Sequence, residues 1–198
     1  MPRIALTGGI ACGKSLLARC LNELGVETID ADDVAHELIP DAAERRRIAA
    51  EVFADPAKRR ELEARIHPLV KARIEKFLEE GRRTEDRRQR IGKEPSVLCP
   101  LSSALRLAVI PLLFEVHWDS EYDIICCVAS TRENQISRMM STRGYTREEA
   151  EARLAAQLPV EEKAAKSHYV IDNNGTAEEL KANAKRLVKW LEAKSLGT

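Results

Sequence analysis

Residues 8–15, Gly-Gly-Ile-Ala-Cys-Gly-Lys-Ser, have the spacing G-x-x-x-x-G-K-[ST], which is typical of a loop that binds phosphate groups. Gly8 and Gly13 allow the backbone to curl so that several N–H groups face one point, where an anion can bind. Lys14 is placed to reach the β- and γ-phosphates of a nucleotide, and the Ser15 hydroxyl is placed to bind Mg²⁺. ATP and Mg²⁺ are the predicted cofactors, and the predicted nucleotide contacts are Gly8, Gly9, Ala11, Cys12, Gly13, Lys14, Ser15 and Leu16.

The residues on either side of this segment decide between a phosphate loop and an ordinary glycine turn. Residues 4–6 (Ile-Ala-Leu) form a short apolar run typical of a strand, and residues 16–21 have the pattern of a helix. A strand, a loop and a helix in this order are the context that the motif requires. The N-terminus of the helix would add partial positive charge at the phosphate position. The sequence therefore favours the phosphate loop.

Three aspartates come directly after the second predicted strand, residues 26–29. In a parallel sheet, ligands bind at the carboxyl ends of the strands, so Asp30 and Asp32 are expected near the phosphate loop. A carboxylate there can accept the proton of an attacking hydroxyl or hold Mg²⁺ through water. We predict a catalytic role for Asp32. The alternative is that these aspartates cap a helix or form a turn, and we assign that role to Asp33.

Segment 141–163 is rich in Arg, Glu and Ala and fits a helical hairpin. A hinged lid with guanidinium groups would stabilise the charge that develops in phosphoryl transfer and would exclude water. Alternatively, the arginines pair with glutamates on a solvated helix face, and we prefer this interpretation for Arg147. Arg143, which precedes Gly144 at a predicted hinge, is the catalytic candidate. The arginines in or beside the segment are Arg138, Arg143, Arg147 and Arg153.

The segment 172–175, Asp-Asn-Asn-Gly, follows the last predicted strand and matches D-x-x-G, a GTPase switch motif. It lies late in the chain, and no N-K-x-D motif that would bind a guanine base is present, so we reject a GTPase. The Asn173 amide and the backbone at Gly175 could instead contact a purine. An ordinary turn fits these residues equally well.

The histidines and cysteines indicate no transition-metal site. His36 and His67 are isolated, and the sequence contains no H-x-x-x-H motif or Cys/His cluster. The 5 cysteines have no C-x-x-C spacing and are expected to be reduced thiols of a cytoplasmic protein. Cys12 lies beside Lys14 just before a helix, a setting that can lower the pKa of a thiol. We keep two hypotheses for Cys12: an ionised, accessible thiol that reacts with alkylating agents, or a thiol packed in place of serine.

These candidate residues need secondary structure to position them. The expected strands are residues 4–6, 26–29, 105–110, 122–129 and 168–171. The expected helices are residues 32–38, 42–54, 57–81, 131–140 and 177–195, together with the hairpin at 141–163. Strands that alternate with helices predict an α/β fold with a parallel sheet covered on both faces. The continuous apolar run at 122–129 is expected for a strand buried on both faces.

The middle of the chain is highly charged. Pro56 and Pro68 each fit the first turn of a helix. Residues 82–95 are polar and non-periodic and are predicted to form an exposed loop. The run is basic, so an electrostatic contact with a substrate or partner is the alternative, but a solvated loop is preferred.

The overall composition fits one domain, with or without a movable lid. The chain has 198 residues, 44% of them hydrophobic, and a formal net charge of +0. Such a balance does not resemble a protein that binds nucleic acid over its whole surface. No apolar run is long enough for a signal peptide or a membrane span, so no membrane partner is expected.

Taken together, these residues resemble the dephospho-coenzyme A kinase family, in order and over most of the chain. Gln135, Arg138, Gln157 and Lys163 fit the lid pattern of that family. The other matching segments are 6–15 (phosphate loop), 29–32 with 35–36 (acidic motif), 62–63 with 66–69 (LE-x-x-x-HP), 111–115 (PLL-x-E) and 170–175 (adenine-side motif).

The resemblance implies transfer of the γ-phosphate of ATP to the ribose 3′-hydroxyl of dephospho-CoA, the last step of CoA biosynthesis. It implies a three-layer α/β/α P-loop kinase fold with a parallel sheet, as a single domain over residues 1–198 that is expected to be monomeric. A helical CoA-binding part is expected at about 36–95 and a lid at about 141–163. Asp32 matches the proposed base of the family, and the expected substrate contacts are Asp30, His67 and Arg138.

The sequence departs from the family pattern in the phosphate loop, in the middle of the chain and near Arg143. Ala11 and Cys12 stand where the family usually has Gly and Ser, and Leu16 stands where a second hydroxyl is common. A stretch of about twenty residues that the family often has is missing between Ile39 and Ala42, and the 82–100 region is correspondingly long. Arg143 is displaced by one residue from the usual spacing.

Two other functions are compatible with the phosphate loop. One is another nucleoside or metabolite kinase of the same fold, which a panel of acceptors would distinguish. The other is a non-enzymatic regulator that binds ATP and shows no acceptor-dependent turnover.

Overall fold

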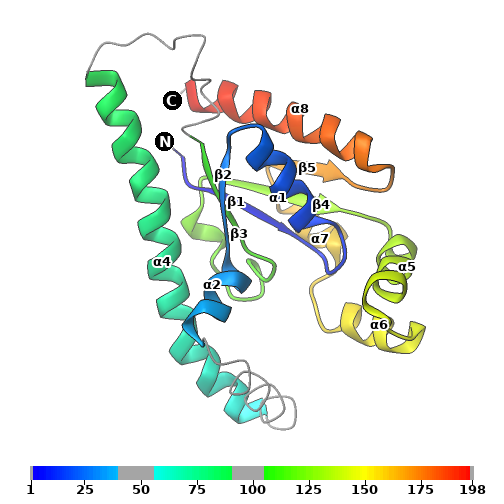
Figure 1. The fold of residues 1–198 in the computed structure, drawn as a ribbon. Coiled ribbons are helices and arrows are strands. Elements are labelled where there is room, and N and C mark those ends of the chain that lie inside the picture. Colours follow the sequence, from blue (N-terminus) through cyan, green and yellow to red (C-terminus); the bar gives the residue numbers. More distant parts are fainter. Residues whose placement is uncertain (1, 40–55, 91–104, 197–198) are drawn as a thin grey trace.

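The fold is built on one parallel sheet, shown in the computed structural model of Figure 1. The structure describes residues 2–39, 56–90 and 105–196. The sheet has 5 strands in the order β2-β3-β1-β4-β5, and all neighbouring pairs are parallel. The strands are β1 (Ile4–Gly8), β2 (Glu27–Asp30), β3 (Arg106–Val109), β4 (Ile124–Ala129) and β5 (Tyr169–Asp172). Each predicted strand is therefore confirmed, with ends shifted by one or two residues.

Side chains alternate across the sheet and form two cores. Ile4 and Leu6 of β1 pack in one core with residues of α1 (Lys14–Glu23) and α8 (Ala177–Leu196). Ala5 packs in the other core with residues of α2 (Ala31–Leu38) and α4 (Pro56–Arg90). Since successive residues of a strand point to opposite faces, helices cover both sides, as the three-layer prediction requires.

Strand β4 lies inside the sheet and is buried over most of its length. Its first five residues are buried, which confirms the prediction from the apolar run at 122–129. It lies between β1 and β5, and α7 (Val160–Ala165) contacts both β4 and β1. A strand in this position has no exposed face, so its sequence is apolar throughout.

The long helix α4 corrects two predictions. The sequence predicts a loop from residue 82, but residues 82–90 continue the helix to Arg90, while 91–95 lie outside the described residues. Arg, Glu and Gln are good helix formers, so polarity alone does not indicate a loop. Pro68 lies inside the helix, not in its first turn, whereas Pro56 does begin it.

The interior proline is tolerated because α4 packs against the sheet. Val70, Ile74 and Leu78 are spaced by four residues and are all buried. Burying such side chains gains about 1.5–3 kcal/mol each, which offsets the cost of about 3 kcal/mol for an interior proline. The predicted helix at 42–54 lies outside the described residues.

The segment predicted as a lid forms two helices that pack in different places. The helix α5 (Arg132–Arg143) contacts α6 (Arg147–Ala155), and Figure 1 shows both beyond the end of the sheet where β1 leads into α1. In contrast, α7 packs on β1 and β4. The segment 141–163 is therefore not one hairpin, because its last helix belongs to the core.

A short 3₁₀ helix, η2 (Asp119–Glu121), precedes β4. Within the described ranges, no helix has the length and apolar character needed to cross a membrane.

Candidate active site

The phosphate loop connects β1 to α1, and its backbone requires two glycines. Gly8 has φ +145° and Gly13 has φ +93°, a region that side chains rarely adopt. A Cβ atom at Gly8 would overlap the carbonyl oxygen of Val128 on β4, and one at Gly13 would overlap the side-chain amide of Asn173. Only glycine fits both positions without displacing its neighbours.

Ala11 also has a positive φ, +57°, although it carries a Cβ atom. This is the position where the family usually has glycine. The left-handed backbone costs a non-glycine residue about 1–2 kcal/mol, so the departure is accommodated with some strain.

Three side chains from distant segments hold the loop, and we call Gln135, Arg138 and Asn173 the loop clamp. They donate to the carbonyl oxygens of residues 10, 11 and 12 at 2.7, 3.3 and 2.8 Å, respectively. Arg138 also donates to the carbonyl oxygen of Asn173 at 2.6 Å, which links two members of the clamp. With these carbonyl oxygens bound, the loop is fixed in shape before any ligand binds.

Lys14 is the first residue of α1 and lies within the loop. Its ammonium group donates to the carbonyl oxygens of Gly8 and Gly9, both at 2.8 Å. Burial lowers the pKa of Lys14, and the nearby charge of Lys163 acts in the same direction. The two aspartates 30 and 32 act in the opposite direction but more weakly. A phosphate group here would favour the charged form of Lys14.

The structure contradicts the hypothesis of a reactive Cys12. Its side chain is 0% exposed and packs in the core beneath the loop. Burial raises the pKa of Cys12, and the charges of Lys14 and Arg138 only partly oppose this effect. The thiol is therefore packed in place of serine, which was the alternative. The four cysteines within the described ranges are free and buried; Cys99 lies outside those ranges.

A polar cavity of about 340 Å³ opens in front of the loop. Its wall brings together predicted site residues from three separate segments of the sequence. Arg143 is the last residue of α5, and Gly144 ends that helix with φ +69°. The predicted site residues that line the polar cavity are Ala11, Gly13, Lys14, Ser15, Leu16, Asp30, Asp32, Arg138 and Arg143.

Asp30 and Asp32 have different roles at the start of α2. Asp30 is the N-cap, and its Oδ1 accepts from the Asp32 N–H at 2.9 Å. Burial raises the pKa of Asp30 above its usual value. The side chain of Asp32 is exposed in the first turn of the helix. The cap is thus Asp30 and not Asp33, which corrects the assignment made from the sequence.

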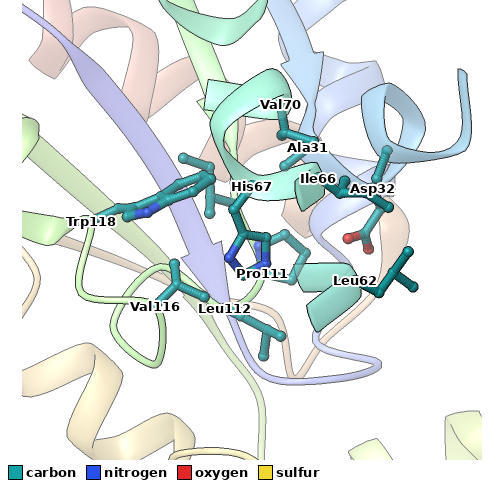
Figure 2. Close-up of a pocket in the computed structure, with 12 residues that line it drawn as sticks. Ala31, Asp32, Leu62, Ile66, His67, Val70, Pro111, Leu112, Val116 and Trp118 are labelled. Atoms are coloured by element: carbon teal, nitrogen blue, oxygen red, sulfur yellow. The ribbon is translucent and has the colours of Figure 1, made fainter. Parts of the chain in front are cut away.

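A second, apolar cavity of about 220 Å³ lies beside the first (Figure 2). Leu62, Ile66 and His67 of α4 line this cavity, and Trp118 lies beside His67, where the two rings meet edge-on at 5.6 Å between centroids. The predicted contact His67 therefore lines a cavity. Asp32 stands at its side, and Figure 2 shows this carboxylate near Leu62.

The two cavities share residues. Asp32 and Pro111 line both of them. Pro111 lies two residues after the end of β3, and Asp32 lies two residues after the end of β2, so the carboxyl ends of adjacent strands place them together. An acceptor bound in the apolar cavity would present its reacting group to Asp32, with a phosphate donor on the other side.

Other predicted residues lie elsewhere. Arg147 pairs with Glu133 at 2.9 Å and with Glu151 at 3.2 Å, as the solvated-face alternative proposed. Arg153 packs over the ring of Tyr145. Neither arginine lines the polar cavity.

The predicted purine contacts also lie outside the two cavities. The side-chain amide of Asn173 is bound to the loop, as described above. Gly175 precedes α8, where Thr176 and Glu179 exchange hydrogen bonds. A Cβ atom at Gly175 would meet the carboxylate of Glu179, the far end of a flexible side chain.

Sequence reasoning missed two features of the site. Trp118 carries no motif and reaches the apolar cavity only through the turn after β3. Lys163, matched to a lid pattern, is instead fully buried beside Glu115 at 2.7 Å. An isolated lysine in a charged helix gives no sign of burial, so only the fold reveals it.

Comparisons with known proteins show the family of this chain. The family model described as dephospho-CoA kinase matches residues 3–44 and 41–179. The chain belongs to the dephospho-CoA kinase family. The two matched segments overlap at 41–44, next to the place where the sequence is expected to lack a stretch of the family pattern.

Individual relatives extend the family assignment over nearly the whole chain. A dephospho-CoA kinase from Synechococcus sp. (strain JA-3-3Ab) is 38% identical over 209 residues, which cover 92% of this chain and 90% of that protein. Among solved structures, TT1252 from Thermus thermophilus has 30% identity and a TM-score of 0.72, with 96% and 98% of the two chains covered. A dephospho-CoA kinase from Campylobacter jejuni shares the fold, with 23% identity, a TM-score of 0.65 and 98% of each chain covered.

Proposed function

We propose that this protein transfers the γ-phosphoryl group of ATP to the ribose 3′-hydroxyl of dephospho-CoA. The family assignment supports the substrates. The observation that carries the proposal is the position of Asp32, which lines both the polar cavity of the phosphate loop and the adjoining apolar cavity. A transfer reaction needs one group at the junction of a donor site and an acceptor site.

In the proposed reaction one bond forms and one bond breaks at phosphorus. The 3′-oxygen forms a bond to the γ-phosphorus, and the bond from that phosphorus to the β–γ bridging oxygen breaks, which releases ADP. Asp32 accepts the proton of the 3′-hydroxyl as a general base. Its exposed carboxylate is free of the capping role, because Asp30 performs it.

The loop holds the donor. Its N–H groups and Lys14 would bind the β- and γ-phosphates, and Lys14 would exchange its two loop carbonyls for phosphate oxygens. Arg143 and Arg138 line the same cavity, and Arg143 is the exposed one that can contact the transferring group.

The residues present fit Mg²⁺. The Ser15 hydroxyl and the carboxylates of Asp30 and Asp32 line the polar cavity, and oxygen ligands from one or two side chains plus phosphates are what Mg²⁺ prefers. When bound with ATP, the ion would neutralise phosphate charge. Within the described residues no cluster of three His, Cys, Asp or Glu side chains could hold a metal, so phosphate oxygens would complete its ligand set.

The apolar cavity would receive the acceptor. If the ribose lies at Asp32, the adenine bonded to it is the planar group that can enter the apolar cavity lined by His67 and Trp118. His67 and Trp118 would contact this base, and Asp30 the ribose. For the ATP molecule, the segment 173–175 beside the loop remains the predicted purine contact.

The other parts of the proposal concern the cell and the assembly. We place the enzyme in the cytoplasm as a monomer; the free, buried cysteines within the described ranges fit a reducing compartment. Residue 36 onward through α4 would form the CoA-binding part, and α6 with its flanks the lid. Nothing in these ranges suggests binding to nucleic acid or to a membrane.

A panel of acceptors tests the proposal. Purified protein is incubated with MgATP and either dephospho-CoA, adenosine or shikimate, and ADP is measured. We expect turnover with dephospho-CoA well above that with the other two. Preference for another acceptor would indicate a different metabolite kinase, and ATP binding without acceptor-dependent turnover would indicate a regulator.

A further inference from the structure

Helix α7 carries a lysine that is fully buried. The ammonium group of Lys163 lies 2.7 Å from Glu115 Oε1 and donates to the carbonyl oxygen of Pro111 at 2.9 Å. The same Glu115 oxygen accepts from the N–H of Leu158 at 3.1 Å. The Glu115 side chain is 23% exposed, although its Oε2 atom is buried; we call Glu115 and Lys163 the buried pair.

The buried pair is a poor means of gaining stability. Removing two charges from water costs several kcal/mol per ion, and apolar side chains of similar volume are often as stable or more so. The second carboxylate oxygen of Glu115 is also buried and has no hydrogen-bond partner within the described residues. What the pair provides and apolar residues could not is a set of directed hydrogen bonds.

The hydrogen bonds of the buried pair reach segments that line the donor and acceptor cavities. Pro111 lines both cavities, and its carbonyl oxygen also accepts from the hydroxyl of buried Thr7, directly before the phosphate loop. Leu158 follows Gln157, which lines the polar cavity and lies in the linker between α6 and α7. The pair thus connects the wall between the cavities, the entry to the loop and the end of the lid.

We propose that Glu115 and Lys163 are positioning residues of the transfer reaction, which fix the Pro111 wall and the α6–α7 linker relative to the phosphate loop. The inference rests on the proposed function. Neither residue lines either cavity, so both act through the groups they bind. The charge of Lys163 also reaches Lys14, whose pKa it helps to lower.

This role predicts a separation between binding and chemistry. ATP is held by the loop, and the loop clamp fixes the loop from other elements. Loss of the buried pair should therefore leave ATP affinity nearly unchanged. A small displacement of Pro111 and of the linker would misalign donor and acceptor, which can lower a rate by about 10–100-fold.

The test is the double variant Glu115→Gln/Lys163→Met. It removes both charges together, so no unpaired charge is left in the core, and it removes the bond to Pro111. We expect kcat with dephospho-CoA to fall by about 10-fold or more, while the ATP dissociation constant changes by less than about threefold. The matched control is Glu27→Gln/Arg106→Met, which breaks a 2.7 Å ion pair between the first residues of β2 and β3, at the ends of these strands away from the cavities, and should leave kcat within about twofold.

The possible results test the positioning role of the buried pair separately from the proposed function. A double variant that keeps more than half of the wild-type kcat would overturn the inference. If the double variant does not fold, Glu115→Asp shortens the carboxylate by one methylene and should show the same loss of kcat with the fold retained; wild-type kcat in that variant would also overturn it.

Hydrogen exchange provides a readout that does not depend on turnover. Exchange in the peptide covering residues 156–160 should be faster in both the double variant and Glu115→Asp than in the control, because the charged acceptor of the Leu158 N–H is lost or displaced. Unchanged exchange contradicts the inference. Wild-type protein without acceptor-dependent turnover contradicts only the proposed function.

Discussion

The two cavities that meet at Asp32 are built differently. The polar cavity has a wall fixed by hydrogen bonds, since the loop clamp binds the carbonyl oxygens of residues 10–12. The apolar cavity is formed by side chains of α4 and of the segment after β3, with His67 and Trp118 in edge-on contact. A site that stabilises the charge developing in a transition state benefits from fixed dipoles. A site that binds an organic group instead needs a complementary shape and apolar surface.

This difference predicts that substitutions on the polar side reduce the rate or ATP binding, and that substitutions on the apolar side affect the acceptor. The largest effect is expected at the residue common to both. Asp32→Asn keeps the size of the side chain but removes its charge and its ability to accept a proton, so kcat should fall by about 10²–10⁴-fold with little change in ATP affinity.

The matched control for Asp32 is Asp33→Asn, which changes the next residue of the same helix turn. Asp33 is exposed and lines neither cavity, so kcat should stay within about twofold. Full activity of Asp32→Asn would reverse the assignment, and loss in Asp30→Asn alone would move the role to Asp30.

Lys14→Ala tests the charge on the donor side. Loss of one preorganised contact to the developing charge costs about 2.7–4 kcal/mol, so steady-state turnover should fall by about 10²–10³-fold. Arg19→Ala, an exposed cation of the same helix, serves as the control and should have no such effect. More than half of the wild-type rate in Lys14→Ala would contradict the phosphate-loop assignment.

Trp118→Ala tests the acceptor side. Removing the ring beside His67 should raise the KM for dephospho-CoA by about 10-fold or more, through loss of aromatic contact area, while the ATP dissociation constant stays unchanged. Trp190→Ala, which removes a ring packed against Tyr169 on β5, is the control for general loss of an aromatic residue. Equal effects of the two substitutions on acceptor KM would contradict the assignment of the apolar cavity.

Asn173→Ala tests the loop clamp. The carbonyl oxygen of Cys12 would lose its buried donor, which costs about 1–3 kcal/mol. We expect the ATP dissociation constant, measured by calorimetry, to rise by about 3–10-fold while acceptor KM changes little. If the acceptor KM changed more than the ATP dissociation constant, Asn173 would act on the acceptor site and not on the phosphate loop.

The smallest effect is expected for alkylation of Cys12. A raised pKa leaves less thiolate at any pH below it, and thiolate is the reactive form, so iodoacetamide at pH about 8 should leave Cys12 unmodified. Mass spectrometry of the folded and the urea-unfolded protein measures this directly. Labelling of the folded protein that MgATP prevents would restore the hypothesis of an accessible thiol.

The phosphate loop, the strands and the family were predictable from the sequence because their signals are local. Gly8 and Gly13 occupy positions that the backbone requires, and β4 is apolar because both of its faces are covered. The order of strands in the sheet then brings Asp32 to the loop without any further signal.

The predictions that were wrong, left open or not made depend on contacts between distant residues. The burial of Cys12 and Lys163 is set by helices packed from other parts of the chain, and the interior position of Pro68 is set by the packing of α4. A helix of charged residues after Gly81 has the composition of a loop, and composition alone cannot distinguish the two. Trp118 joins the site through a turn that follows β3, which no spacing in the sequence indicates.

The central claim is that a phosphoryl group passes from the polar cavity to an acceptor in the apolar cavity at Asp32. Its most direct test is ADP formation from MgATP with and without dephospho-CoA, with the product examined by ³¹P and ¹H NMR. The account predicts ADP and a new phosphomonoester on the ribose 3′-oxygen in equal amounts, formed only when the acceptor is present. ADP release that does not depend on dephospho-CoA, or phosphate attached at another oxygen, would contradict it.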